Sequence, residues 1–341
     1  AIYPEIESVS FDLNYTGAVN DLEPLDVVVG GTYGELPTPA ARTGYTFGGW
    51  YTDAACSGSA VTAQSMVTGA ATLYAKWTIV ADTSALIPSY TTETATTAVS
   101  RDFIDGKDTI IFTTEGKTLI NTGWQRRLEF VSNDADKEIV KFRFKYVSNN
   151  NAGGQAVAPK INFFIGGLDT SNTGSCVVTD GNGNVVTELT TGVWYTFYGM
   201  TRGNTRLVLY PCNTTEQLRT TLYIQDRELL DYEPDIHIRD EAHAYYGNTA
   251  VYEDADGNWM YHFRSFTGDE HHGNSAWNRR TYLDVTGDYN YVAFEFKYNV
   301  ATYIASGAEA VDKVGFAYMA GVSYFDQEGN PVAAADLKVG T

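Results

Sequence analysis

The sequence predicts an all-β protein, and its composition is the first reason. The 341 residues include 24 Tyr, 16 Phe and 40 Thr, which favour strands, and 32 Gly, which serve the turns between strands. Nine Pro and only 19% charged residues leave few long runs that are compatible with a helix. At about 100–200 residues per domain, this length predicts two or three domains.

The net charge of the chain argues against some classes of binding partner. There are 23 Lys+Arg against 42 Asp+Glu, a formal net charge of −19. Such a chain repels phosphate groups, so we expect no nucleic-acid partner. No stretch approaches about 18 consecutive apolar residues, so we expect no membrane insertion. Residues 1–7 lack the basic and apolar regions of a signal peptide, and we interpret the chain as an excised part of something longer.

Residues 1–78 form the first expected domain. Alternating residues at 8–13 predict a strand, and a Pro-rich turn follows at 36–39. Two aromatic-rich strands, 44–53 and 73–77, then flank a loop of small residues. A unit this small has little surface to bury, so we expect its Trp50 and Trp77 to close a core and not to bind a ligand.

The same residues resemble a known family. Gly-Tyr-Thr-Phe-x-Gly-Trp-Tyr-Thr-Asp at 44–53, followed by Leu-Tyr-Ala-Lys-Trp at 73–77, is similar to the Listeria–Bacteroides repeat, the internalin B-type repeat, over residues 8–77. The resemblance implies a small β-grasp module that serves as a stalk or spacer in bacterial surface and secreted proteins. That family has no catalytic residues to transfer. The chain departs from the pattern in having a single copy, with Ala40 and Ala41 adding a residue to the Pro-rich turn.

Residues 79–96 are short, polar and Thr-rich, and we interpret them as a linker with room for one pairing strand. The rest of the chain contains an internal repeat, in which five motifs recur at a nearly constant offset. The pairs are Thr97-Ala98-Val99 with Thr249-Ala250-Val251, Asp105-Gly106 with Asp256-Gly257, residues 121–127 with 274–280, residues 142–146 with 294–298, and the turn Asp180…Gly183-Asn184 with Asp326…Gly329-Asn330.

Each copy alternates with a period of two. Phe142, Phe144 and Tyr146 must share one face of a strand, with Arg143 and Lys145 on the other. Short strands separated by Gly, Asn and Asp turns predict two tandem jelly-roll-like β-sandwich modules, at 97–235 and 236–341.

The second module is expected to be incomplete at its C-terminus. Gly340-Thr341 corresponds to Gly192-Val193, so the counterparts of strands 205–210 and 221–224 are lacking. A sandwich without them would expose an apolar face and an unpaired edge. We expect the natural chain to continue, or a neighbouring molecule to supply the missing strands.

A Trp-x-Arg-Arg motif is the sharpest candidate for a binding site, because an indole stacks on sugar C–H groups and a guanidinium donates to hydroxyls. Its alternative is structural: the tryptophans fill the core, and one arginine of each pair meets a local carboxylate. The motif occurs in both modules, as Trp124, Arg126 and Arg127 and as Trp277, Arg279 and Arg280.

Metal and disulfide signals are weak. The five histidines, His237, His243, His262, His271 and His272, lack preset ligand spacing and predict no metal site. Asp254-x-Asp256-Gly257-Asn258 begins like a calcium loop, but Ser265 at its twelfth position excludes an EF-hand. We expect no cofactor, with a structural Ca²⁺ as the open alternative. Cys176 and Cys212 lie in one module, so a disulfide between them is also open.

No nucleophile elbow, zinc-protease motif or phosphate-binding loop is present, so we expect no enzyme activity from this segment. The interpretation is a non-catalytic part of a bacterial extracellular or cell-surface protein that binds a glycan or another cell-surface ligand, with carbohydrate favoured. The alternatives are a purely structural stalk or protein–protein adhesin, and the ancillary domains of a larger secreted glycoside hydrolase.

Overall fold

A computed structural model of the chain describes most of its first two thirds and separate parts of the remainder. The described residues are 3–88, 97–114, 127–132, 134, 136–159, 162–165, 168–169, 176–186, 188–201, 205–210, 218–231, 236–238, 248–264, 283–285, 293–296, 323–333 and 336. They contain strands and turns and no α-helix, so the predicted all-β class is confirmed.

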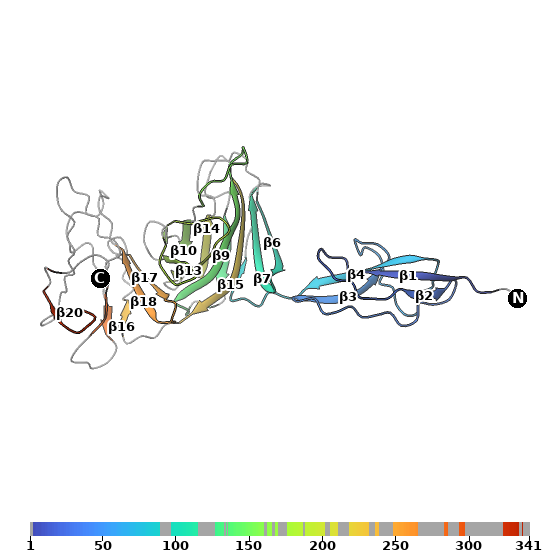
Figure 1. The fold of residues 1–341 in the computed structure, drawn as a ribbon, viewed down its shortest axis with the longest axis horizontal. Coiled ribbons are helices and arrows are strands. Elements are labelled where there is room, and N and C mark those ends of the chain that lie inside the picture. Colours follow the sequence, from blue (N-terminus) through green and yellow to red (C-terminus); the bar gives the residue numbers. More distant parts are fainter. Residues whose placement is uncertain are drawn as a thin grey trace.

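The N-terminal unit is a four-stranded sheet with the order β2-β1-β4-β3, and it lies at one end of the molecule (Figure 1). Strands β1 and β4 are parallel, and the other two pairs are antiparallel. Its strands are β1 (Ile6–Asp12), β2 (Leu25–Val28), β3 (Tyr45–Tyr51) and β4 (Ala71–Ile79).

Both tryptophans of this unit serve its core, as expected. Trp50 is 2% exposed and packs on Phe11 and Phe47, and its indole N–H donates to the Pro37 carbonyl at 2.8 Å. The Trp77 indole N–H donates to the Leu13 carbonyl at 2.8 Å. Trp77 is partly buried against the same core, and each indole satisfies its donor.

Two sheets pack face to face in the next unit, which we call the first sandwich. One sheet has the order β11-β10-β14-β8-β5 and the other the order β12-β13-β9-β15-β7-β6. The strands of the first sheet are β5 (Leu86–Pro88), β8 (Leu128–Ser132), β10 (Asn162–Ile165), β11 (Leu168–Asp169) and β14 (Arg206–Tyr210). Those of the second are β6 (Thr97–Ile104), β7 (Lys107–Thr114), β9 (Ile139–Asn150), β12 (Cys176–Thr179), β13 (Trp194–Met200) and β15 (Arg219–Leu230).

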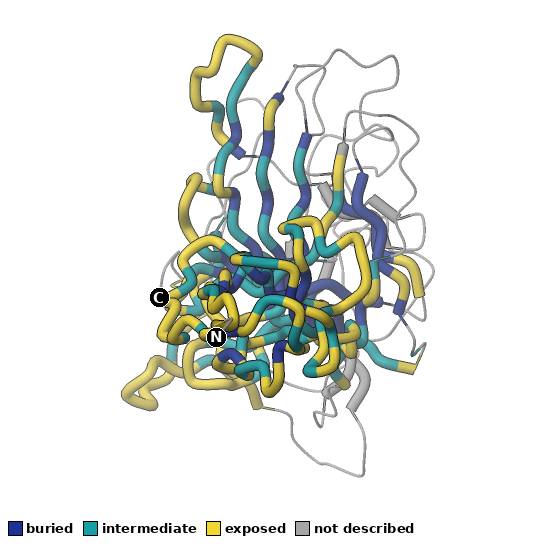
Figure 2. Tube along the Cα trace, turned by 90° about the vertical axis from the view of Figure 1, so that its right-hand side faces the viewer, coloured by how far each residue is buried: buried dark blue, intermediate teal, exposed yellow. Residues whose placement is uncertain are grey.

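The core of the first sandwich lies between these sheets. Phe130 and Leu209 enter it from the five-stranded sheet, and Phe142, Phe144 and Tyr146 enter it from the six-stranded sheet. Buried and less buried residues alternate along the long strands (Figure 2). The predicted sharing of one face by the three aromatic residues of β9 is confirmed.

Within 236–341 the described residues form three two-stranded pairs. They are β16 (Ile236–Ile238) with β19 (Leu283–Val285), β17 (Asn248–Glu253) with β18 (Trp259–Arg264), and β20 (Tyr324–Phe325) with β21 (Pro331–Val332). Each pair has a counterpart in the first sandwich. Pair β16–β19 corresponds to β5–β8 and hairpin β17–β18 to β6–β7. Pair β20–β21 corresponds to the bridge between Thr179 and Val185 on either side of the turn at 180–184. The internal repeat of the sequence is therefore also a repeat of strand pairings.

Two residues show how the modules differ. Phe142 and Phe144 are fully buried in the first sandwich, whereas their counterparts Phe294 and Phe296 are 44% and 37% exposed. The same apolar positions therefore face a core in the first copy and are partly exposed in the second, and an incomplete second module stays a prediction.

Three hairpin turns share one construction. In each, an Asp carboxylate accepts hydrogen bonds from the backbone N–H and the side-chain amide of an Asn four residues later. The Gly before that Asn has a φ of 76°, 83° and 83°, respectively, a backbone conformation that favours glycine. The turns are Asp180–Asn184, Asp254–Asn258 and Asp326–Asn330. The calcium-like segment at Asp254 is thus a hairpin turn.

Candidate ligand-binding face and the joints beside it

Of the six residues in the two Trp-x-Arg-Arg motifs, only Arg127 lies within the described residues; Trp124, Arg126, Trp277, Arg279 and Arg280 lie outside them. Arg127 is 6% exposed, and its Nε donates to Glu129 at 2.5 Å. Arg206 donates to the same carboxylate at 2.7 Å. This contact is of the kind that the structural alternative describes, an arginine that meets a local carboxylate. Ligand binding by the two Trp-x-Arg-Arg motifs stays a prediction.

Burial acts to raise the pKa of Glu129, but the hydrogen bonds from Arg206 and Arg127 outweigh it and hold that pKa below its ordinary value. The carboxylate is therefore ionised at neutral pH. It pairs strand β8 with β14 through side chains as well as through backbone hydrogen bonds.

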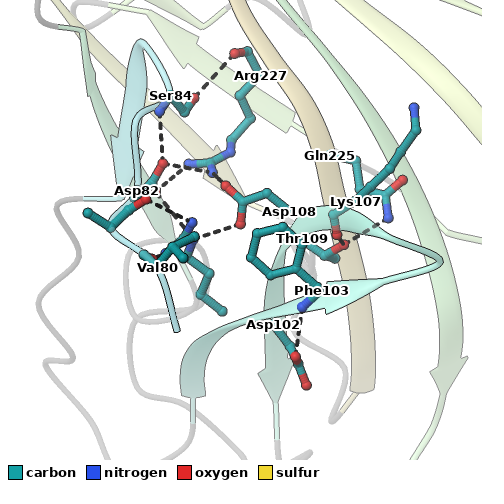
Figure 3. Close-up of polar contacts among 12 residues, drawn as sticks. Val80, Asp82, Ser84, Asp102, Phe103, Lys107, Asp108, Thr109, Gln225 and Arg227 are labelled. Carbon is teal, nitrogen blue, oxygen red and sulfur yellow. Dashed lines mark hydrogen bonds and ion pairs between the residues drawn. The ribbon is translucent and has the colours of Figure 1, made fainter. Parts of the chain in front are cut away.

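A second cluster of charges ties segment 79–88, which follows the N-terminal sheet, to the first sandwich (Figure 3). The guanidinium of Arg227 is 2% exposed, and it donates to both carboxylate oxygens of Asp82, at 3.0 and 3.2 Å. It also donates to Asp108 at 2.7 Å and to the Leu86 carbonyl at 2.7 Å. Arg101 donates to Asp108 at 2.6 Å, so two arginines and two carboxylates balance each other.

The local backbone explains how Arg227 reaches this position. The pairing of β15 with β9 shifts register between Gln225 and Glu228, and Asp226 has a φ of 49°. Such a bulge redirects the side chains of its strand. Burial acts to raise the pKa of Asp82, but hydrogen bonds from Arg227 and from the Ser84 backbone hold it below the ordinary 3.8.

The N-terminal sheet also contacts the sandwich directly. The backbone N–H of Val80 donates to the Gly44 carbonyl at 2.9 Å, and Arg101 donates to the Val80 carbonyl at 2.5 Å. A Cβ on Gly44 would lie 2.1 Å from the ring of Phe103. The two units therefore meet at close packing distance, so that segment 79–88 connects them without slack.

Residues 8–76 match the family model of the Listeria-Bacteroides repeat domain. The matched residues are those of the N-terminal sheet. The match confirms the resemblance drawn from the motifs at 44–53 and 73–77, and the rest of the chain is not recognised. No curated protein and no solved structure matches the chain. The described residues contain no helix that is long and apolar enough to cross a membrane.

On the far side of the sandwich from the Listeria–Bacteroides repeat, hairpin β17–β18 covers part of the six-stranded sheet (Figure 1). Val251 of the hairpin packs with Ile139, Tyr198 and Met200, all of them buried. Lys141 donates to Glu253 at 2.6 Å across the same contact. Only one part of this outer sheet face is therefore covered by the hairpin.

The part that the hairpin leaves uncovered carries a row of side chains, which we call the Trp194 row. Strand pairing places Trp194 of β13 opposite Lys145 of β9, Lys145 opposite Tyr223 of β15, and Tyr223 opposite Ile111 of β7. All four side chains are partly exposed. Because neighbouring strands lie roughly 4.8 Å apart, Trp194 and Tyr223 stand about 10 Å from each other across Lys145.

Cations lie against this row. The ammonium of Lys145 is 4.7 Å from the Trp194 ring centroid and 5.7 Å from that of Tyr223. The guanidinium of Arg143 is 5.0 Å from the Trp194 centroid and 3.5 Å from the Asp226 carboxylate. Such cation–π contacts stabilise by about 0.5–1 kcal/mol at exposed sites. They hold the aromatic rings and the charges on one surface.

The sequence contained one signal for this row. Residues 194–198 place aromatic side chains on both faces of a single strand, and the inward pair, Tyr195 and Phe197, already fills the core. The aromatic residues on the outward face therefore do not belong to this core, and they either pack against another element or face solvent. Tyr198 is covered by the β17 hairpin, whereas Trp194 is not among the residues that pack there.

The histidines and cysteines considered in the sequence form no further candidate site among the described residues. No group of three or more metal-ligating side chains occurs in the described part of the chain. Of the five histidines, His237 and His262 fall within described strands, and His243, His271 and His272 lie outside the described residues. Cys212 also lies outside them, so the structure does not test a disulfide with Cys176.

Proposed function

We propose that this chain is a non-catalytic part of a bacterial extracellular or cell-surface protein whose first sandwich binds carbohydrate through the Trp194 row. The Listeria–Bacteroides repeat is found in cell-surface proteins, which supports the general setting. The row supports the specific role, and the two Trp-x-Arg-Arg motifs stay a separate prediction.

The observation that carries the proposal is the placement of Trp194 and Tyr223 on either side of Lys145. Rings held by neighbouring strands of a sheet form a rigid surface, since the sheet fixes their spacing. Sugar C–H groups stack on such rings, and the cations donate to hydroxyl oxygens. The distance of about 10 Å between the two rings suits an oligosaccharide better than a single sugar.

The test is retention of the protein on immobilised polysaccharides, compared with Trp194→Ala. We expect retention to be lost in this variant while its melting temperature stays close to that of the wild type, because Trp194 lies outside the buried cores. Phe325→Ala is the matched control, since it removes a 62% exposed aromatic side chain elsewhere. Equal retention of wild type and Trp194→Ala would contradict the proposal.

A second candidate, a structural spacer, is favoured by the joint at Arg227. A spacer must hold its units in a fixed orientation, and Arg227 ties segment 79–88 to the sandwich through Asp82 and Leu86. Small-angle scattering tests this role: a fixed joint gives a single elongated profile, whereas a broad ensemble of shapes would contradict it. Failure of all polysaccharides to retain the protein, together with a single elongated shape, would favour the spacer.

A further inference from the structure

We propose that the ligand of the Trp194 row is an acidic polysaccharide, a polyuronate whose carboxylates pair with Lys145 and Arg143. This inference rests on the proposed carbohydrate-binding function and names the class of glycan. It follows from the charges on the row and from the position of the Lys145 ammonium.

The row is positively charged on a strongly acidic protein. Lys145 and Arg143 of β9 lie in or beside the row, and Lys107 of β7 lies beyond the intervening strand β15. Asp226 is the carboxylate paired with the latter two, at 3.5 Å from Arg143 and 2.6 Å from Lys107. Among the described residues no carboxylate forms an ion pair with Lys145. Because the whole chain carries a net charge of −19, this local excess of cations runs against the general repulsion of anions.

The position of Lys145 should make the row bind acidic sugars more tightly than neutral ones. Its ammonium lies over the Trp194 ring and near the Tyr223 ring, where a sugar would stack. A neutral sugar displaces the ammonium from the rings and offers it no charge in return. A uronate sugar supplies a carboxylate, so Lys145 exchanges its aromatic contacts for an ion pair while the sugar ring takes its place.

Strand order also sets the direction of the bound chain. Trp194, Lys145 and Tyr223 follow one another across β13, β9 and β15, perpendicular to the strands. Arg143 lies two residues from Lys145 on the same face of β9. A polyuronate lying along the row therefore crosses Lys145, with Arg143 roughly 6.8 Å to one side along β9, within reach of a neighbouring carboxylate.

The test compares polygalacturonate with its methyl ester, which has the same backbone but no free carboxylates. Alginate and hyaluronan extend the set to other uronates, and a sulfated neutral glycan separates carboxylate recognition from general attraction to anions. We expect the complete chain to bind at least one polyuronate about tenfold more tightly than its esterified or sulfated comparison. We also expect this preference to decline with added salt.

Lys145→Gln should bring the affinity for the polyuronate down to that for the ester. Lys76→Gln is the matched control, because Lys76 makes the same type of contact, 4.9 Å from the Tyr51 ring centroid, in the Listeria–Bacteroides repeat. Lys76→Gln should bind as the wild type does. A melting curve for each variant shows that the fold is retained.

The outcomes separate the inference from the proposed function. Binding of ester and acid alike, lost in Trp194→Ala but kept in Lys145→Gln, would overturn the acidic ligand and leave carbohydrate binding intact. Tighter binding of the sulfated glycan would overturn the uronate. No retention by any polysaccharide would overturn both.

Discussion

The Tyr45 hydroxyl donates a hydrogen bond to the Asp102 carboxylate, and this contact joins β3 of the Listeria–Bacteroides repeat to β6 of the sandwich. Burial and this hydrogen bond raise the pKa of Tyr45 above its ordinary value of 10.0. The stabilisation is therefore complete below pH 10 and is lost as the pH rises through the raised pKa. The difference between the tyrosinate absorbance titrations of wild type and Tyr45→Phe should have its midpoint above pH 10. A midpoint at or below pH 10 would show that the contact does not form in solution.

Arg227→Met should strongly destabilise the first sandwich. It removes the 2% exposed side chain that pairs with both Asp82 and Asp108, although Arg101 still pairs with Asp108, and breaking a buried ion pair costs about 3–5 kcal/mol. Chemical denaturation measures the loss. Arg143→Met is the control, because its contact with Asp226 is exposed and should contribute less than about 1 kcal/mol. Similar losses in the two variants would contradict the buried role of Arg227.

Acid should weaken the same joint. Since the pKa of Asp82 is lowered in the folded protein, its stabilisation is present above pH 3.8 and is lost as the pH falls through the lowered pKa. We expect Asp82→Asn to be less stable than the wild type at neutral pH and to lose less stability on acidification. Melting temperatures across this pH range give both values. Parallel curves of melting temperature against pH for the two proteins would show that Asp82 does not cause the loss of stability in acid.

Gly44→Ala tests the close packing of the two units. Gly44 has a φ of 79°, so any side chain strains the backbone, and a Cβ there would also lie 2.1 Å from Phe103. Gly34→Ala introduces the same kind of strain at a φ of 73°, with no atom within 4 Å of the Cβ. We expect Gly44→Ala to lower the melting temperature more than Gly34→Ala and to change the scattering profile. Equal effects would indicate that the units do not pack together here.

Calcium should not stabilise the protein through the Asp254 turn. The Asp254 carboxylate already accepts hydrogen bonds from Asn258 and Asp256, which lower its pKa. We expect equal melting temperatures in excess Ca²⁺ and in a chelator. A rise with Ca²⁺ that Asp254→Asn abolishes would instead restore the calcium alternative.

The sequence predicted those features of the fold that depend on residues close together in the chain. The alternation at 142–146 placed Phe142 and Phe144 in the core because a strand has a period of two wherever it pairs. The motifs at 44–53 and 73–77 predicted the repeat for a similar reason, since Trp50 and Trp77 make their contacts within one small unit.

Contacts between distant residues were beyond prediction from the sequence. Asp82 lies in a polar segment that has the composition of a linker, and its partner Arg227 follows 145 residues later. The Trp194 row depends in the same way on the register of β13, β9 and β15, which the sequence of any one strand does not specify. Arg127 of the Trp-x-Arg-Arg motif donates to Glu129, a carboxylate two residues away, and the motif alone does not specify that contact.

Strand β5 determines where a recombinant fragment of the first sandwich should begin. Its pairing with β8 recurs as β16 with β19, so the ancestral unit that was copied began upstream of Thr97. A recombinant fragment that starts at Thr97 would leave the edge of β8 bare and remove Leu86 from the core. The first sandwich should be expressed from a boundary that precedes Asp82, where the ancestral copy and the Arg227 ion pair both remain whole.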